Sequence, residues 1–247
     1  MNPVLISDFD GVIVDGMEEY WWSARQVAVG LLPAQAVLPQ AVPASFRALR
    51  PKVLHGWEMG VLAAALAGYG AELEAFERDY PQALAQSLDG LGWSPEQLTE
   101  SLDRVRHGAI ATDRQAWVAR HRPYPWMLAC LQRLQRQGEP WRVLTTKSEA
   151  FTAELLACHG LTPEAIHGRE QGPKPQVLLR LRDEGVWSDE VLFLEDRRLT
   201  LEAVQATQGL SGVRGVLASW GYLQPGDDEN LPPGLAVVRQ EQLAQWP

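Results

Sequence analysis

The spacing of hydrophobic residues changes twice along this chain of 247 residues. A short apolar run, Val4–Ser7, opens the chain and is typical of a buried parallel strand. From about Met17 to Arg120 the apolar residues recur at helical spacing, in long stretches rich in Ala and Leu. From Pro123 onward, amphipathic segments alternate with short apolar runs. This pattern predicts an α/β core that is interrupted after its first strand by an all-helical insert.

The insert is predicted to contain a series of helices. They run from about Met17 to Leu32, Ala44 to Gly68, Ala71 to Leu88 and Ser94 to His121. Pro51 and Pro81 lie inside two of these segments and predict a break or kink, because proline removes a helical hydrogen bond. Ser94 marks the clearest start, since a proline and then Gln97 follow it at the positions of a capping box. The segment 33–43, rich in Pro, Ala and Gln, is predicted to be a loop.

The core is predicted to be a Rossmann-like parallel sheet with helices on both faces. Its expected strands are Val4–Ser7, Trp141–Thr145, Ala165–His167, Val191–Leu194 and Val213–Leu217, with Leu235–Val238 as a possible edge strand. Its expected helices are Pro125–Gln137, Phe151–His159, Gln176–Glu184 and Thr200–Thr207. Helix–strand alternation of this kind favours a parallel sheet. Because the first strand needs partners, we expect residues 1–16 and 122–247 to form the core domain and residues 17–121 to form the inserted domain.

Polar residues gather where the predicted strands end, which is where ligands bind in sheets of this kind. They are Asp8 and Asp10 after the first strand, Thr145 with Thr146 and Lys147 after the second, Glu195 and Asp196 after a later strand, and Lys174 in a proline-flanked loop. Carboxylates at positions i and i+2 lie on one side of an extended chain, where they can hold a divalent cation or share a proton. A hydroxyl and an ammonium group supply the further contacts that a phosphoryl group needs.

Each of these residues also has a simpler interpretation when it is taken alone. The first two aspartates can cap a turn. Thr145 can be an ordinary hydroxyl at a strand end, Lys174 a solvated loop charge, and Glu195 the cap of the following helix.

Composition narrows the range of partners. The 31 Asp and Glu residues exceed the 22 Lys and Arg residues, for a net charge of -9. This disfavours nucleic acid and anionic membranes, because no general attraction to phosphate is available. No apolar stretch approaches a membrane span in length, and the first apolar run is too short for a signal peptide. Cys130 and Cys158 lie in apolar helical patterns, which favours buried thiols in a reducing compartment. We expect a cytoplasmic protein that binds a small molecule, with no obligate protein partner evident.

At this point the chain resembles the haloacid dehalogenase superfamily, in its phosphatase and phosphomutase branch. The run Asp8-Phe-Asp-Gly-Val looks like motif I, Thr145 after Val-Leu looks like motif II, and Lys174 within Gly-Pro-Lys-Pro looks like motif III. Glu195 with Asp196 looks like the acidic motif IV in the form found in beta-phosphoglucomutase-like members. The resemblance covers about half of the chain and implies that the insert is a helical cap of the C1 type.

The resemblance also implies a role for each motif residue. Asp8 would be the nucleophile that forms an aspartyl-phosphate. Asp10 would protonate the leaving oxygen and then activate water. Thr145 would hydrogen-bond the transferring oxygens, while Lys174 would neutralise charge and keep the nucleophile ionised. Magnesium would be held by Asp8, the backbone carbonyl of Asp10, Asp196 and Glu195.

Magnesium-dependent hydrolysis of a small phosphate monoester is the activity that the resemblance implies. The second aspartate of motif I, Asp10, favours a phosphate ester, because the dehalogenase and phosphonatase branches lack it. Thr146 and, in the insert, Arg50 are further predicted substrate contacts. A phosphomutase of the beta-phosphoglucomutase type and a catalytically silent binding protein of the same fold stay open as alternatives. A receiver-type signalling domain fits badly, since it is about half as long and has no insert after its first strand.

Overall fold

The computed structural model describes residues 4–187 and 190–245, and the chain divides into two compact units. One unit, the core, comprises Met1–Asp15 and Arg122–Pro247, and the other, the insert, comprises Gly16–His121. Residues 1–3, 188–189 and 246–247, which the predicted core domain includes, lie outside the described residues. Each unit buries apolar side chains of its own.

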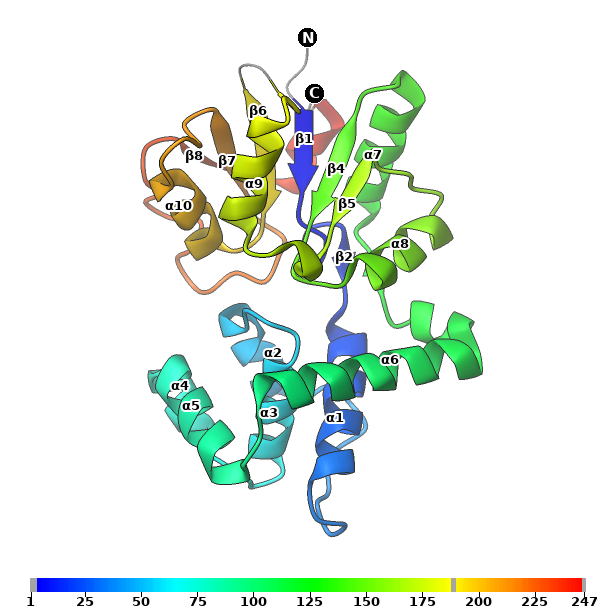
Figure 1. The fold of residues 1–247 in the computed structure, drawn as a ribbon, viewed down its shortest axis with the longest axis vertical. Coiled ribbons are helices and arrows are strands. Elements are labelled where there is room, and N and C mark those ends of the chain that lie inside the picture. Colours follow the sequence, from blue (N-terminus) through cyan, green and yellow to red (C-terminus); the bar gives the residue numbers. More distant parts are fainter. Residues whose placement is uncertain (1–3, 188–189, 246–247) are drawn as a thin grey trace. The chain divides into compact units, whose positions relative to one another are not determined.

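Within the described residues, the core is built on a six-stranded parallel sheet (Figure 1). Its strands are β1 (Val4–Ser7), β4 (Trp141–Leu144), β5 (Ala165–His167), β6 (Val191–Glu195), β7 (Val213–Ala218) and β8 (Leu235–Val238). Their order in space is β5-β4-β1-β6-β7-β8, so the possible edge strand is indeed at an edge. In the middle, Ser7 of β1 lies opposite Val143 of β4 and Leu194 of β6. The three strands therefore deliver their carboxyl ends to one place.

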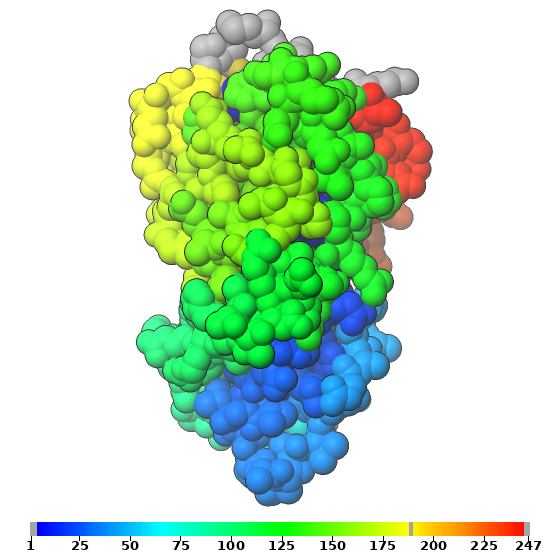
Figure 2. Space-filling view, turned by 90° about the vertical axis from the view of Figure 1, so that its right-hand side faces the viewer, coloured from blue at the N-terminus to red at the C-terminus, as the bar shows by residue number. Residues whose placement is uncertain are grey.

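Helices cover the sheet and close the core. They are α7 (Pro125–Gln137), α8 (Glu149–Cys158), α9 (Lys174–Asp183) and α10 (Arg198–Ala206), with the short 3₁₀ helices η2 (Arg169–Gln171) and η3 (Gln240–Gln245). On one face, Val177 of α9 and Leu201 of α10 share a buried cluster with Phe193 of β6. Figure 1 draws α9 and α10 in front of the sheet and η3 behind β1. Figure 2 shows η3, in red, beside the green α7, where Arg133 donates a hydrogen bond of 3.2 Å to the carbonyl of Leu243. The predicted fold class is confirmed.

The sequence pattern does not predict the two-residue strands β2 (Val14–Asp15) and β3 (Arg122–Pro123). They pair in antiparallel fashion, with Val14 opposite Pro123 and Asp15 opposite Arg122. Two residues are too few to show the alternation by which strands are found in a sequence. The pairing brings together the chain segments that lead into and out of the insert.

The insert is helical throughout its regular structure. Its helices are α1 (Met17–Leu31), α2 (Ala44–Leu49), α3 (Glu58–Leu66), α4 (Leu73–Arg78), α5 (Tyr80–Leu91) and α6 (Pro95–Val118), with η1 (Arg50–Lys52) after α2. Two predicted helices are each split in two, next to Pro51 and Pro81, as the prolines predict. The hydroxyl of Ser94 accepts a hydrogen bond of 3.2 Å from the backbone N–H of Gln97, which confirms the predicted start of α6. The non-helical backbone at Asp113 inside α6 was not expected.

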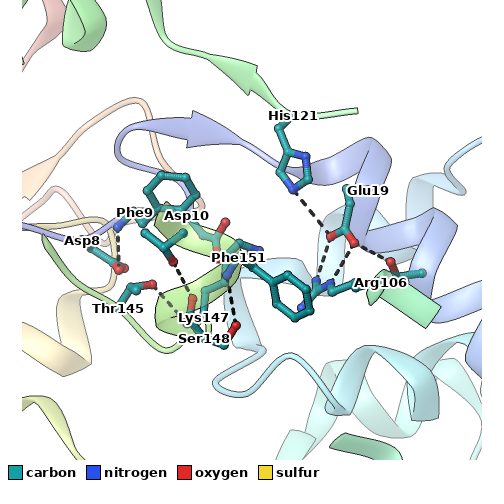
Figure 3. A network of polar contacts seen from close by, with 12 residues as sticks. Asp8, Phe9, Asp10, Glu19, Arg106, His121, Thr145, Lys147, Ser148 and Phe151 are labelled. Atoms are coloured by element: carbon teal, nitrogen blue, oxygen red, sulfur yellow. Dashed lines mark hydrogen bonds and ion pairs between the residues drawn. The ribbon is translucent and has the colours of Figure 1, made fainter. Parts of the chain in front are cut away.

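A buried carboxylate, that of Glu19 in α1, ties the insert together (Figure 3). Arg106 of α6 donates to both of its oxygens, from Nε at 2.8 Å and from Nη2 at 2.7 Å. Ser23 donates to it at 2.5 Å and the indole of Trp117 at 3.4 Å, and Nε2 of His121 lies 3.9 Å away. An isolated buried charge is costly, so this set of donors is what makes Glu19 acceptable in an apolar interior.

Two further expectations concern the chain as a whole. No helix within the described ranges is long and apolar enough to cross a membrane. Cys130 is buried, but Cys158 is exposed, so the predicted burial is wrong for Cys158. Cys158 is the last residue of α8. Its position fits the apolar spacing of the helix, but that spacing does not show that the helix ends there.

Candidate active site

Three adjacent strands of the core bring the predicted site residues to one edge of the sheet. Thr145 follows β4, Asp8 follows β1, and Glu195 ends β6 with Asp196 directly behind it. The backbone N–H of Asp8 donates a hydrogen bond of 2.8 Å to the carbonyl of Leu194, which continues the β1–β6 pairing one residue beyond the strand. The sheet order β4-β1-β6 therefore gathers side chains that are up to 188 positions apart in the sequence.

The chain turns sharply after Asp8. The carbonyl of Phe9 accepts a hydrogen bond of 2.8 Å from the N–H of Ile13, and Gly11 has a φ of 83°, a conformation that favours glycine. Asp10 lies within this turn and forms an isolated bridge with Val14. The two carboxylates, which were expected to act as a pair, contact different lysines, as Figure 3 shows for Asp10.

Lys174 is the partner of the first carboxylate. It is the first residue of α9, it is buried, and its Nζ lies 2.9 Å from Oδ2 of Asp8 and 2.6 Å from Oε2 of Glu195. Burial alone would lower the pKa of Lys174, but the charges of these two carboxylates outweigh it and raise the pKa well above its usual value. The other oxygen of Glu195 accepts a hydrogen bond of 3.1 Å from the N–H of Arg197. Glu195 is therefore held from both ends and in turn holds Lys174.

The ionisation of Asp8 is governed by more than its lysine. Burial, followed by the charge of Glu195, raises the pKa of Asp8 to about 7. Lys174 and the N–H of Phe9, which donates a hydrogen bond of 2.7 Å to Oδ1, act in the opposite direction. The expectation that Lys174 keeps Asp8 ionised thus has the right sign, but burial and the neighbouring carboxylate are stronger. The site holds more negative charge than one lysine balances.

This excess charge is what a divalent cation would neutralise. One oxygen from each of Asp8, Glu195 and Asp196 lies within 4.8 Å of the others, and all three residues are buried. Buried like charges disfavour one another, and magnesium prefers oxygen ligands of this kind. The residues therefore fit the predicted magnesium site. Asp10, the fourth predicted ligand, would contribute its backbone carbonyl, while its side chain is engaged elsewhere.

Asp196 is positioned by a segment that the sequence did not single out. After β7, the backbone N–H of Tyr222 donates a hydrogen bond of 2.8 Å to Oδ2 of Asp196. A Cβ placed on Gly221 would lie 2.2 Å from the Cβ of Asp196, so only glycine allows this approach. The phenol of Tyr222 also donates a hydrogen bond of 2.7 Å to Asp15. The one local signal for this segment is the Gly-Tyr pair that follows the end of a predicted strand.

The loop after β4 contributes the hydroxyl and a second lysine. The Oγ1 of Thr145, a buried residue, accepts a hydrogen bond of 3.2 Å from the N–H of Lys147, so its own proton can be donated to a ligand. Thr146 is half-buried beside it. Lys147 is buried, and its Nζ lies 3.3 Å from Oδ2 of Asp10 (Figure 3). Sequence reasoning placed Lys147 among the polar residues at strand ends but missed this contact, because it assigned the chemistry to Lys174.

Arg50 is the predicted site residue that belongs to the insert. It opens η1, and its guanidinium carbon lies 4.8 Å from the centroid of the Tyr20 ring, within the range of a cation–π contact. Its contact with substrate stays a prediction.

Comparisons with known proteins bear on the fold. No protein-family model matches the sequence, and no curated protein matches it either. Among solved structures, a protein described as a haloacid dehalogenase-like hydrolase from Bacteroides fragilis matches with a TM-score of 0.63 at 16% identity, over 98% of this chain and 100% of that one. A predicted phosphatase from Clostridium acetobutylicum matches with a TM-score of 0.62 at 14% identity, over 99% and 97% of the two chains. A protein described as a beta-phosphoglucomutase from Thermotoga maritima matches with a TM-score of 0.55 at 16% identity, over 99% and 97%.

Proposed function

Because this chain has the fold of the haloacid dehalogenase-like hydrolases, we propose that it is a magnesium-dependent phosphate monoester hydrolase. The observation that carries the proposal is the buried cluster of Asp8, Glu195 and Asp196 at the carboxyl ends of the central strands, with Lys174 between two of its members. A carboxylate nucleophile, a cation site and a fixed lysine together suit the transfer of a phosphoryl group.

The first half of the proposed reaction phosphorylates the protein. A carboxylate oxygen of Asp8 attacks phosphorus, the bond to the ester oxygen breaks, and Asp10 gives that oxygen its proton, so that an alcohol leaves. The N–H of Phe9 and the ammonium group of Lys174 hold Asp8 during the attack. Thr145 donates its hydroxyl proton to a phosphoryl oxygen. Asp8, Glu195 and Asp196 would hold magnesium, whose positive charge would offset the repulsion between these carboxylates and the anionic ester.

The second half of the reaction restores the carboxylate. Water attacks the phosphorus of the aspartyl-phosphate while Asp10 takes one of its protons, and inorganic phosphate leaves. Glu195 is not modified in either half, so its contact with Lys174 can keep the ammonium group in place throughout the reaction.

A phosphomutase is the second candidate, since one structure that shares the fold is described as a beta-phosphoglucomutase. The two activities use the same first step and differ in what accepts the phosphoryl group, water or a hydroxyl of the substrate. Release of inorganic phosphate from a range of phosphorylated metabolites favours the hydrolase. Isomerisation of a sugar phosphate without such release favours the mutase.

The proposal is tested first with a panel of phosphorylated metabolites (sugar phosphates, phosphoglycolate, nucleotides and pyridoxal phosphate), each assayed for phosphate release with magnesium and after exhaustive chelation. Release that requires magnesium is expected for at least one of them. Full turnover after chelation would contradict the metal assignment. No release from any compound, and no isomerisation of a sugar phosphate, would favour the silent binding protein.

The mechanism is tested by comparing Asp8→Asn with Asp10→Asn, two changes that nearly preserve shape. With 2,4-dinitrophenyl phosphate as donor, whose leaving oxygen needs little protonation, we expect the Asp10→Asn protein to accumulate a phosphoenzyme. Intact mass spectrometry detects it directly. The Asp8→Asn protein lacks the nucleophile and is expected to stay unmodified, with turnover at background. A phosphorylated Asp8→Asn protein would refute the assignment of Asp8.

A further inference from the structure

Lys147 is a buried lysine that the proposed mechanism does not use. Its side chain is only 2% exposed, and its backbone is fixed on both sides. Its N–H donates to Oγ1 of Thr145 at 3.2 Å, and its carbonyl accepts a hydrogen bond of 3.0 Å from the N–H of Arg169. Directly after it, Ser148 caps α8 by accepting a hydrogen bond of 3.3 Å from the N–H of Phe151. The ammonium group therefore projects from a rigid loop.

One partner of this ammonium group is the carboxylate of Asp10. The Nζ of Lys147 lies 3.3 Å from its Oδ2, and that side chain is 14% exposed. The lysine extends from the loop after β4 and the aspartate from the turn after β1, so the contact exists because these two strands are neighbours. The site thus contains two buried lysines, since Lys174 contacts Asp8 and Glu195.

From this arrangement we propose that Lys147 is a positioning residue, which holds the carboxyl group of Asp10 where it exchanges a proton with the leaving oxygen and with water. The inference rests on the proposed function and deepens it. Asp10 lies in the sharp turn that the Ile13 N–H to Phe9 carbonyl hydrogen bond closes, and a carboxylate side chain can in general adopt more than one rotamer. An ion pair from a rigid loop selects among them, and a displacement of about 1 Å at an acid–base group can cost about 10²-fold in rate.

A different role, direct binding of the substrate phosphate, predicts a different pattern of losses. A lost phosphate contact would lower the reactivity of every phosphate ester alike. A misplaced acid–base group would penalise esters whose leaving oxygen needs a proton and spare those whose leaving oxygen does not.

The test compares two substrates on one preparation of each variant, with magnesium present. Phenyl phosphate has a leaving group that needs protonation, and 2,4-dinitrophenyl phosphate has one that does not. The value of kcat/KM reports the steps up to phosphorylation of the protein, and its ratio between the two substrates does not depend on the fraction of folded protein. For Lys147→Met we expect kcat/KM to fall by about tenfold or more with phenyl phosphate and by less than about threefold with 2,4-dinitrophenyl phosphate.

Asp10→Asn and the double variant Asp10→Asn/Lys147→Met complete the experiment. In the Asp10→Asn background, the loss of Lys147 is expected to change kcat/KM for phenyl phosphate by less than about twofold, because the group that it positions is already gone. Lys147→Arg, which keeps a cation, is expected to lie closer to the wild type in the substrate ratio than Lys147→Met.

Equal losses of Lys147→Met with both substrates, or an undiminished further loss in the Asp10→Asn background, would overturn the positioning role. Both outcomes leave an active wild-type phosphatase and are therefore distinct from failure of the proposed function, in which the wild-type protein releases phosphate neither from the two esters nor from any compound of the metabolite panel.

Discussion

The buried ion pair of the insert allows a quantitative prediction about stability. Glu19 is fully buried and Arg106 is 3% exposed, and two hydrogen bonds of 2.8 and 2.7 Å join them in a bidentate contact between α1 and α6. Substituting Arg106→Met removes the cation and leaves the carboxylate in an interior that solvates it poorly. Breaking a buried pair in this way typically costs about 3–5 kcal/mol in the free energy of unfolding.

A second substitution is expected to recover part of this loss. Glu19→Gln removes the stranded charge, while its amide oxygen still accepts hydrogen bonds from Ser23 and Trp117. The double variant therefore carries a neutral polar group in place of an uncompensated charge, with a penalty of about 1–3 kcal/mol. From the middle values of the two costs, we expect Glu19→Gln to stabilise the Arg106→Met protein by about 2 kcal/mol, although a polar-to-polar change at a buried site ordinarily has no stabilising effect.

Urea unfolding, followed by tryptophan fluorescence and by far-ultraviolet circular dichroism, measures these differences. With an m-value of about 1–3 kcal/mol/M, the single variant is expected to shift the midpoint of the transition that unfolds the insert by about 1 M or more. Glu184→Gln is a matched control, because this residue is 56% exposed and lies 3.8 Å from Arg180 in a surface pair. It is expected to change stability by less than about 0.5 kcal/mol.

The reasoning fails if Glu19→Gln destabilises the Arg106→Met protein further. Additive losses would mean that Glu19 is not a charged residue that depends on Arg106, and that the insert is held by packing around these side chains.

Four further predictions concern the core. The pKa of Asp8 is raised to about 7 and magnesium binds the carboxylate form, so below that pH a proton must leave when the metal binds. The affinity for magnesium should therefore rise with pH from about 5.5 to 7 and level off above it. An affinity measured by calorimetry that does not change over this range would contradict the prediction. The same raised pKa means that the folded, metal-free protein favours protonated Asp8 more than the unfolded chain does. The free energy of unfolding should therefore fall as pH rises from about 4 to 7, which a series of thermal melts without metal measures. Gly221→Ala places a Cβ 2.2 Å from the Cβ of Asp196 and should weaken magnesium binding at least about tenfold. A magnesium titration with the same dissociation constant as the wild type would contradict this prediction. The insert can be replaced by a two-residue Asn-Gly turn between Asp15 and Arg122, because these residues are already paired in β2 and β3. The product should be a folded core that has lost substrate discrimination. An insoluble product would show that the core needs the insert.

Local patterns in the sequence were sufficient for the elements whose causes are local. The apolar run of β1, the cap at Ser94 and the breaks near Pro51 and Pro81 each depend on residues within one or two turns of the chain, and each is found where it is expected. The alternation of helices and short strands was likewise enough for the parallel sheet, because alternation is what makes successive strands parallel. The ends of the strands could be located from the same pattern, so the polar residues that follow them could be named as candidate site residues.

The tertiary structure alone decided which of those polar groups meet. The resemblance implied that Lys174 serves Asp8, but no local feature assigns Lys147 to Asp10. The contact between Lys147 and Asp10 follows from the pairing of β4 with β1, which is a long-range property of the sheet. Likewise Tyr222 reaches Asp196 from 26 residues away, and its contact is made by a backbone N–H, a group that every residue but proline carries. A contact of that kind depends on where the chain runs in space rather than on which side chain it bears, so the sequence pattern holds no trace of it.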